Sequence, residues 1–131
     1  MKMDLTGEWW GTYYYPDHAG PVTPFNARIQ DNGGHIGGAI VELDQLGDGA
    51  VLNATIIGYR HDLHVDFIKT YDAEAPEEYG NPVDYVGSLS PDGSRIVGVW
   101  SLLEFDGRFE MYREIGAAEK IEETISATVD F

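Results

Sequence analysis

The sequence predicts an all-β fold, a single-domain eight-stranded antiparallel up-and-down barrel with a short C-terminal helix or tail. Hydrophobic residues alternate with a period of two along most of the chain. Turn-forming residues separate these alternating runs. The chain also has 16 glycines in 131 residues, above the usual share of ~7 %, and glycine inside a strand permits the bends of a small barrel. Eight strands can close and leave no free edge, while an open two-sheet sandwich is the alternative.

The expected strands follow one another with short connections. The first covers residues 5–15, is rich in aromatic residues, and ends at the two prolines of residues 16–21. Residues 22–30 and 35–43 form a predicted hairpin, because the Asp-Asn-Gly-Gly stretch at 31–34 supplies the positive φ angles of a tight turn.

The middle of the chain alternates in the same way. Residues 44–49 turn the chain into a strand at 50–59, and a corner at 60–62 leads to a strand at 63–71. Residues 72–82 hold two prolines and several carboxylates, which indicates either a solvated acidic connection or a lid over a cavity.

Three further strands complete the predicted barrel. Residues 83–90 turn at 91–94 into a strand at 95–104, and Asp106-Gly107 is the predicted turn into the last strand at 108–114. In-strand glycines are expected to bend the sheet; they are Gly11, Gly37, Gly38, Gly58, Gly87 and Gly98.

The chain is short enough for one domain, with the barrel at residues 1–115 and a helix or tail at residues 116–131 packed on or beside it. Ala118, Ile121 and Ile125 form one helical stripe in this tail, although residues 126–131 could instead form an edge strand.

Composition excludes several functions. The absence of cysteine removes disulfides, thiolate zinc sites and iron–sulfur clusters. Eight basic against 23 acidic residues give a net charge of −15, so neither nucleic acid nor an anionic membrane is an expected partner. This acidity suits high salt or plain solubility. The first residues carry no apolar signal segment, and we expect a soluble, cytoplasmic protein by default.

Strand parity predicts which side chains face inward. Alternate residues of the first strand point to one side, and the predicted interior set is Gly7, Trp9, Gly11, Tyr13 and Tyr15. Trp9 is expected to plug one end of the barrel, while Tyr13 and Tyr15 line a cavity toward the other end. The outer face then carries Trp10 and Tyr14.

The stretch Leu5-Thr6-Gly7-Glu8-Trp9 resembles the Gly-x-Trp start of calycin-type barrels, a group of lipocalins, fatty-acid-binding proteins and avidins. Residues 57–59, 85–89 and 96–101 are similar to the glycine–aromatic pairs of avidin-like barrels. Met111-Tyr112-Arg113 resembles the last-strand arginine that packs on the early tryptophan in lipocalins or meets a ligand carboxylate in fatty-acid-binding proteins. The resemblance implies a barrel with a small-molecule cavity but no particular family ligand.

Basic residues are few. Lys69 shares a strand face with Phe67 and Tyr71. Lys69, Arg113 and Arg28 could bind an anionic ligand group, or each could pair with one of the abundant carboxylates.

Asp62, His64 and Asp66 would share a strand face, which indicates a divalent-metal site, an acid–base pair or a solvated outer stripe. We favour the solvated stripe, and no metal, cofactor or catalytic residue is predicted. The chain contains no nucleophile elbow, phosphate-binding loop or zinc-binding helix motif.

These patterns predict non-catalytic binding of a small apolar or aromatic molecule in the barrel. The predicted ligand-binding residues are Trp9, Tyr13, Tyr15, Lys69, Tyr85, Trp100 and Arg113. One alternative is a lipocalin-like isomerase, cyclase or hydrolase that uses a cavity carboxylate or His64. A second is a filled barrel that acts as a protein-interaction module, including self-association through Trp10 and Tyr14.

Overall fold

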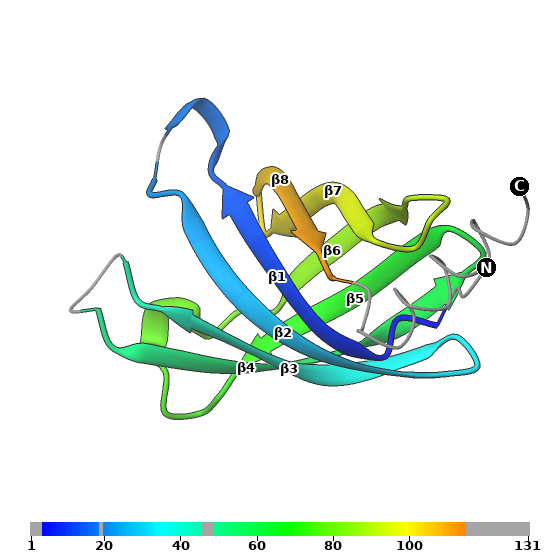
Figure 1. The fold of residues 1–131 in the computed structure, drawn as a ribbon. Coiled ribbons are helices and arrows are strands. Elements are labelled where there is room, and N and C mark those ends of the chain that lie inside the picture. The colour runs from blue at the N-terminus through cyan, green and yellow to red at the C-terminus, as the bar shows by residue number, and fades with distance from the viewer. Residues whose placement is uncertain (1–3, 19, 46–48, 115–131) are drawn as a thin grey trace, which may run out of the picture.

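Eight antiparallel strands close into a barrel in strict sequence order (Figure 1). The computed structural model describes residues 4–18, 20–45 and 49–114. The strands are β1 (Gly7–Tyr14), β2 (Thr23–Asn32), β3 (His35–Leu43), β4 (Val51–His61), β5 (His64–Tyr71), β6 (Val83–Leu89), β7 (Arg95–Leu102) and β8 (Phe105–Tyr112). The pairing of β1 with β8 closes the sheet and sets Gly11 opposite Met111. The up-and-down barrel is thereby confirmed, whereas the predicted helix or tail at 116–131 lies outside the described residues.

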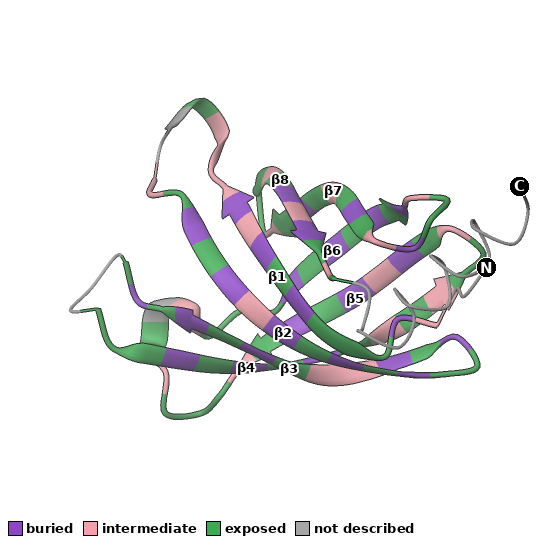
Figure 2. Ribbon diagram, in the orientation of Figure 1, coloured by how far each residue is buried: buried purple, intermediate pink, exposed green. Residues whose placement is uncertain are grey.

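The hydrophobic alternation of the sequence becomes an inner and an outer face. Buried and exposed residues alternate along β2 and β6 (Figure 2). In β1 the predicted parity is confirmed, because Trp9 and Tyr13 are buried while Trp10 is 41 % exposed. Burial of the inward apolar side chains is the main driving force that holds such a sheet closed.

Two of the turns lie at other residues in the structure than the sequence pattern predicts. His61 of β4 pairs with His64 of β5, so the corner predicted at 60–62 is a two-residue turn at Asp62 and Leu63. Asp62 adopts the positive φ that such a tight turn needs, at 53°. The hairpin turn at Gly33 and Gly34 lies inside the predicted 31–34 stretch and is confirmed.

The turn predicted at Asp106-Gly107 is wrong. Leu102 pairs with Phe105, so the chain turns at Leu103 and Glu104, and Asp106 and Gly107 belong to β8. A Cβ at Gly107 would overlap the carbonyl oxygen of Tyr14 and lie 2.6 Å from the Trp100 indole. This glycine therefore makes room for Trp100 across the sheet rather than forming the turn.

The two ends of the barrel differ in their connections. One end carries the turns at 33–34, 62–63 and 90–94. The other, which we call the long-loop end, carries the longer connections at 15–22 and 72–82 (Figure 1). These include the 3-10 turns η1 (Pro16–His18) and η2 (Glu77–Tyr79). Within the described ranges, no helix has the length and apolar character needed to cross a membrane.

Candidate functional site

A cavity of about 160 Å³ lies at the long-loop end. It is lined mostly by aromatic side chains from β1, β5, β6 and β7 and from the 72–82 connection. The lining residues are Tyr13, Tyr15, Lys69, Tyr71, Tyr79, Asn81, Val83, Tyr85, Trp100 and Leu102. Five of the seven predicted ligand-binding residues are therefore brought together around one space.

The middle of the barrel below this cavity is filled. Phe67 and Tyr85 stack with ring centroids 5.0 Å apart, and Phe109 meets Tyr85 edge-on at 4.9 Å. All three side chains are buried. This aromatic layer confines the open space to one end of the barrel.

The wall of the cavity is a corner of three nearly perpendicular rings. Trp100 lies 5.5 Å from Tyr15 at 77° and 6.3 Å from Tyr13 at 74°. The Trp100 indole N–H donates to the carbonyl oxygen of Tyr14 at 2.9 Å, which fixes the ring in place. Edge-to-face geometry of this kind is favourable between aromatic rings, and a ligand ring could join it.

A buried ion pair lies beside the cavity. Lys69 Nζ is 2.9 Å from Oε1 of Glu42, which also accepts a hydrogen bond from the Tyr71 hydroxyl at 3.0 Å. The other carboxylate oxygen accepts from the Tyr13 hydroxyl at 2.6 Å. Glu42 thus accepts three hydrogen bonds from side chains of β1 and β5, and such charge-assisted bonds are stronger than neutral ones.

Aromatic rings surround the Lys69 ammonium group. Its Nζ lies 4.5 Å from the ring centroid of Tyr71, 4.8 Å from that of Tyr13 and 5.3 Å from that of Tyr85. Burial lowers the pKa of Lys69, but Tyr85, Tyr71 and Glu42 outweigh it and hold the pKa above its usual value. Burial raises the pKa of Tyr13 strongly, so its hydroxyl stays protonated and donates to Glu42.

The 72–82 connection also contributes to the site. The Tyr79 ring lies 4.9 Å from Tyr71, and its hydroxyl donates to Oδ1 of Asp44 at 2.6 Å. Asp72, Glu74 and Glu77 are exposed. The acidic part of the connection is therefore solvated, while Tyr79 and Asn81 border the cavity.

Sequence reasoning did not select Glu42, Asp44, Tyr71 or Tyr79. Glu42 had a usable signal, because it shares the parity of Ile36 and Ile40 on a strand whose other inward residues are apolar. An inward carboxylate and an inward lysine in one small barrel predict each other as partners.

The remaining two predicted residues lie at the opposite end. The Arg113 guanidinium lies 4.7 Å from the ring centroid of Trp9, and its Nε donates to the carbonyl oxygen of Gly93 at 2.9 Å. The Trp9 indole N–H donates to the carbonyl oxygen of Leu5 at 2.9 Å. Neither residue borders the cavity, and Arg28 lies exposed on the outer face.

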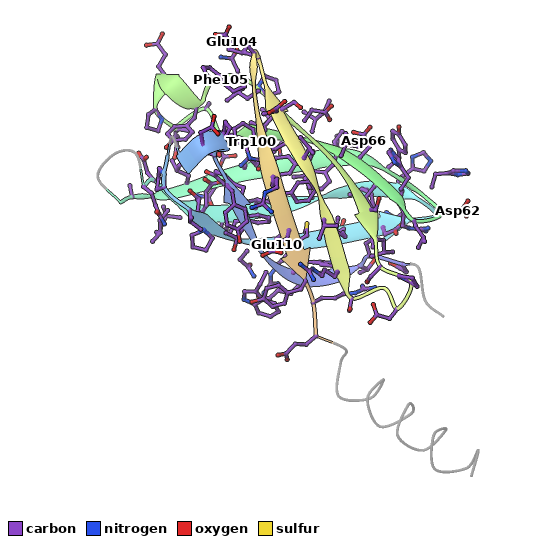
Figure 3. The ribbon with its side chains drawn as sticks, turned by 90° about the horizontal axis from the view of Figure 1, so that it is seen from above. Asp62, Asp66, Trp100, Glu104, Phe105 and Glu110 are labelled. Carbon is purple, nitrogen blue, oxygen red and sulfur yellow. The ribbon has the colours of Figure 1, made fainter. Side chains whose placement is uncertain are left out.

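The hypothesis of an acid–base group at His64 inside the cavity is wrong. His64 is exposed and Asp66 is half-buried on the outer side of β5, because the neighbouring Val65 and Phe67 take the inward positions. Asp62 stands at the tip of the β4–β5 turn (Figure 3). Among the residues that the structure describes, no three His, Asp or Glu side chains are grouped to hold a metal ion.

Fold and site together define a small closed β-barrel with a tyrosine-rich cavity at one end. The sequence matches no family model and no curated protein. Among solved structures, the chain is similar to a redesigned β barrel, with a TM-score of 0.68 and 14 % identity over 85 % of this chain and 92 % of the other. At this identity the likeness shows the fold alone.

Proposed function

We propose that this protein binds a small aromatic or apolar molecule, without catalysis, in the cavity at the long-loop end. The observation that carries the proposal is a space of about 160 Å³ lined mainly by tyrosine and tryptophan rings. Small-molecule sites are typically concave, mostly apolar, and equipped with a few polar groups that orient the ligand. Here Asn81 and Tyr15 are those polar groups, because the hydroxyls of Tyr13, Tyr71 and Tyr79 already donate to Glu42 and Asp44.

The cavity volume limits the size of the ligand. An apolar cavity of about 150 Å³ accepts benzene, whereas sites for drug-sized ligands run from about 300 to 1,000 Å³. The ligand is therefore a single-ring molecule unless the 72–82 connection moves.

A calycin-like character belongs to the same proposal. Supporting it are the eight-stranded closed barrel and the Arg113 guanidinium on Trp9 at the end opposite the cavity. In such an arrangement one end is plugged and the other end admits the ligand.

Titration with toluene and 4-methylphenol, followed by amide chemical shifts, tests the proposal. We expect saturable shifts at residues around the cavity, such as Val83 and Trp100, with outward residues of the same strands unaffected. Val83→Phe fills the cavity and should abolish these shifts. Val86→Phe is the matched control, because Val86 lies on the outer face of the same strand and is 37 % exposed.

Two results would contradict the proposal. One is the absence of saturable shifts with both probes. The other is binding to Val83→Phe as tight as to the wild-type protein, which would place the probes elsewhere on the molecule.

A further inference from the structure

Given the proposed binding function, on which this inference rests, we propose that the cavity selects an uncharged aromatic ring and rejects carboxylate and ammonium analogues of the same shape. The selectivity comes from the Lys69–Glu42 ion pair. Lys69 places a positive charge at the cavity wall, but Glu42 already neutralises this charge, so Lys69 is not available to pair with a charged ligand.

Lys69 is the one charged side chain among the described residues that line the cavity. Its ammonium group already lies over the rings of Tyr13 and Tyr71. An organic cation that entered would lose its hydration and meet this like charge in a weakly screened space. The rings of Tyr13, Tyr71 and Tyr85, which would otherwise attract a cation, are thus occupied by a cation of the protein itself.

A carboxylate ligand meets the opposite difficulty. Lys69 Nζ is 2.9 Å from Glu42, and the two side chains are only 2 % and 1 % exposed. To bind an external carboxylate, Lys69 would have to give up part of this contact and leave Glu42 buried without its full counterion. The carboxylate of Asp44 is buried at the same end, but it accepts the Tyr79 hydroxyl and is not among the residues that line the cavity, so it offers neither ion a contact.

A neutral ring avoids both costs. It can pack edge-on against the corner of Tyr13, Tyr15 and Trp100 without disturbing the ion pair. A hydroxyl substituent on such a ring can find a partner in Tyr15 or Asn81, which border the space. Phenols are therefore the expected class, in contrast to the anion-binding role that a lone inward lysine first indicates.

The test compares three probes of similar shape at pH 7, namely 4-methylphenol, 4-methylbenzoate and 4-methylbenzylammonium. We expect 4-methylphenol to bind, with both ions at least tenfold weaker in dissociation constant by the same chemical-shift titration. An ion that binds within tenfold of 4-methylphenol overturns the selectivity and leaves the binding function standing. Failure of all three probes and of toluene overturns the function itself.

A charge variant tests the cause of the selectivity. Glu42→Gln removes the counterion of Lys69 and keeps one acceptor oxygen, which can serve Tyr13 on one side or Tyr71 on the other, but not both. We expect the affinity for 4-methylbenzoate to rise at least tenfold relative to that for 4-methylphenol. Glu104→Gln is the matched control, since it makes the same change of charge at the exposed tip of the β7–β8 turn (Figure 3).

An equal rise in the relative affinity for 4-methylbenzoate in both variants would mean that net charge alone governs the selectivity. No rise in a folded Glu42→Gln protein would mean that the ion pair does not set the selectivity. Both results overturn the inference. The three-probe comparison on the wild-type protein stands by itself if Glu42→Gln does not fold.

Discussion

Lys69 of β5 and Glu42 of β3 form an ion pair with a 2.9 Å separation inside a barrel whose buried side chains are mostly apolar and aromatic. Because removal of one partner leaves a buried charge uncompensated, we expect Lys69→Met to lower the free energy of unfolding by about 3–5 kcal/mol. Urea denaturation at pH 7, followed by tryptophan fluorescence, measures this loss.

The double variant Lys69→Met with Glu42→Gln separates the pair from its surroundings. It removes both charges and keeps an acceptor for Tyr13, so it should be more stable than Lys69→Met alone. The free energy of unfolding of the double variant is compared with those of Lys69→Met and Glu42→Gln. If its loss equals the sum of the losses in the two single variants, the two residues are not energetically coupled and our interpretation of the ion pair is wrong.

Gly107 is expected to tolerate no side chain. Gly107→Ala would push a Cβ into the Tyr14 carbonyl oxygen and the Trp100 indole, and overpacking of this kind costs about 1–3 kcal/mol. The near-ultraviolet circular dichroism of Trp100 should change as well. Gly37→Ala is the control, because no atom lies within 4 Å of a Cβ built on this other strand glycine, and its stability should change by less than about 1 kcal/mol.

Arg113 should stabilise the end of the barrel opposite the cavity. Arg113→Ala removes both the contact with the Trp9 ring and a hydrogen bond to Gly93, for an expected loss of about 1–3 kcal/mol. Arg108→Ala serves as the comparison, because Arg108 also lies over a ring, 5.1 Å from that of Tyr14, but is exposed. Thermal unfolding that shows equal losses for both variants would contradict a special role of Arg113.

Asp31 should make the stability depend on pH. Burial raises the pKa of this carboxyl, but hydrogen bonds from Arg60 and from the backbone N–H groups of Leu5 and Gly34 lower it below its ordinary value. A lowered pKa in the folded state means that the ionised form stabilises the fold above the unfolded-state pKa of about 3.9, and that this contribution is lost as the pH falls further.

Comparison of the wild type with Asp31→Asn by urea denaturation at pH 7, 5 and 3 measures this contribution. We expect Asp31→Asn to be less stable by about 2 kcal/mol at pH 7 and the difference to shrink at pH 3. A difference that stays constant over this range would show that the ionisation of Asp31 does not contribute.

The eight strands and their order could be predicted because both depend on local signals. Each strand is an alternating run, and each connection in a meander joins neighbours along the chain. The turn at Leu103 and Glu104 could not be predicted in this way. Asp106-Gly107 has the composition of a turn, and only the positions of the Tyr14 carbonyl oxygen and the Trp100 indole on the neighbouring strands explain a glycine at 107.

For the site, parity correctly placed Tyr13 on an inward face, and Lys69 and Tyr85, also predicted ligand-binding residues, are buried as well. Parity does not state how far along the barrel axis an inward residue lies. Trp9 and Tyr13 share one face of β1, yet Trp9 contacts Arg113 at the end opposite the cavity, whereas Tyr13 borders the cavity.

By itself, the sequence determined the all-β class, the number of strands and the faces that they bury, because these follow from a period of two and from turn chemistry within a few residues. The tertiary structure alone decided which inward groups meet. Lys69 and Glu42 are 27 positions apart and come from strands separated by β4. Their contact, and the cavity beside it, exist only because the closed sheet brings non-neighbouring strands across the same interior.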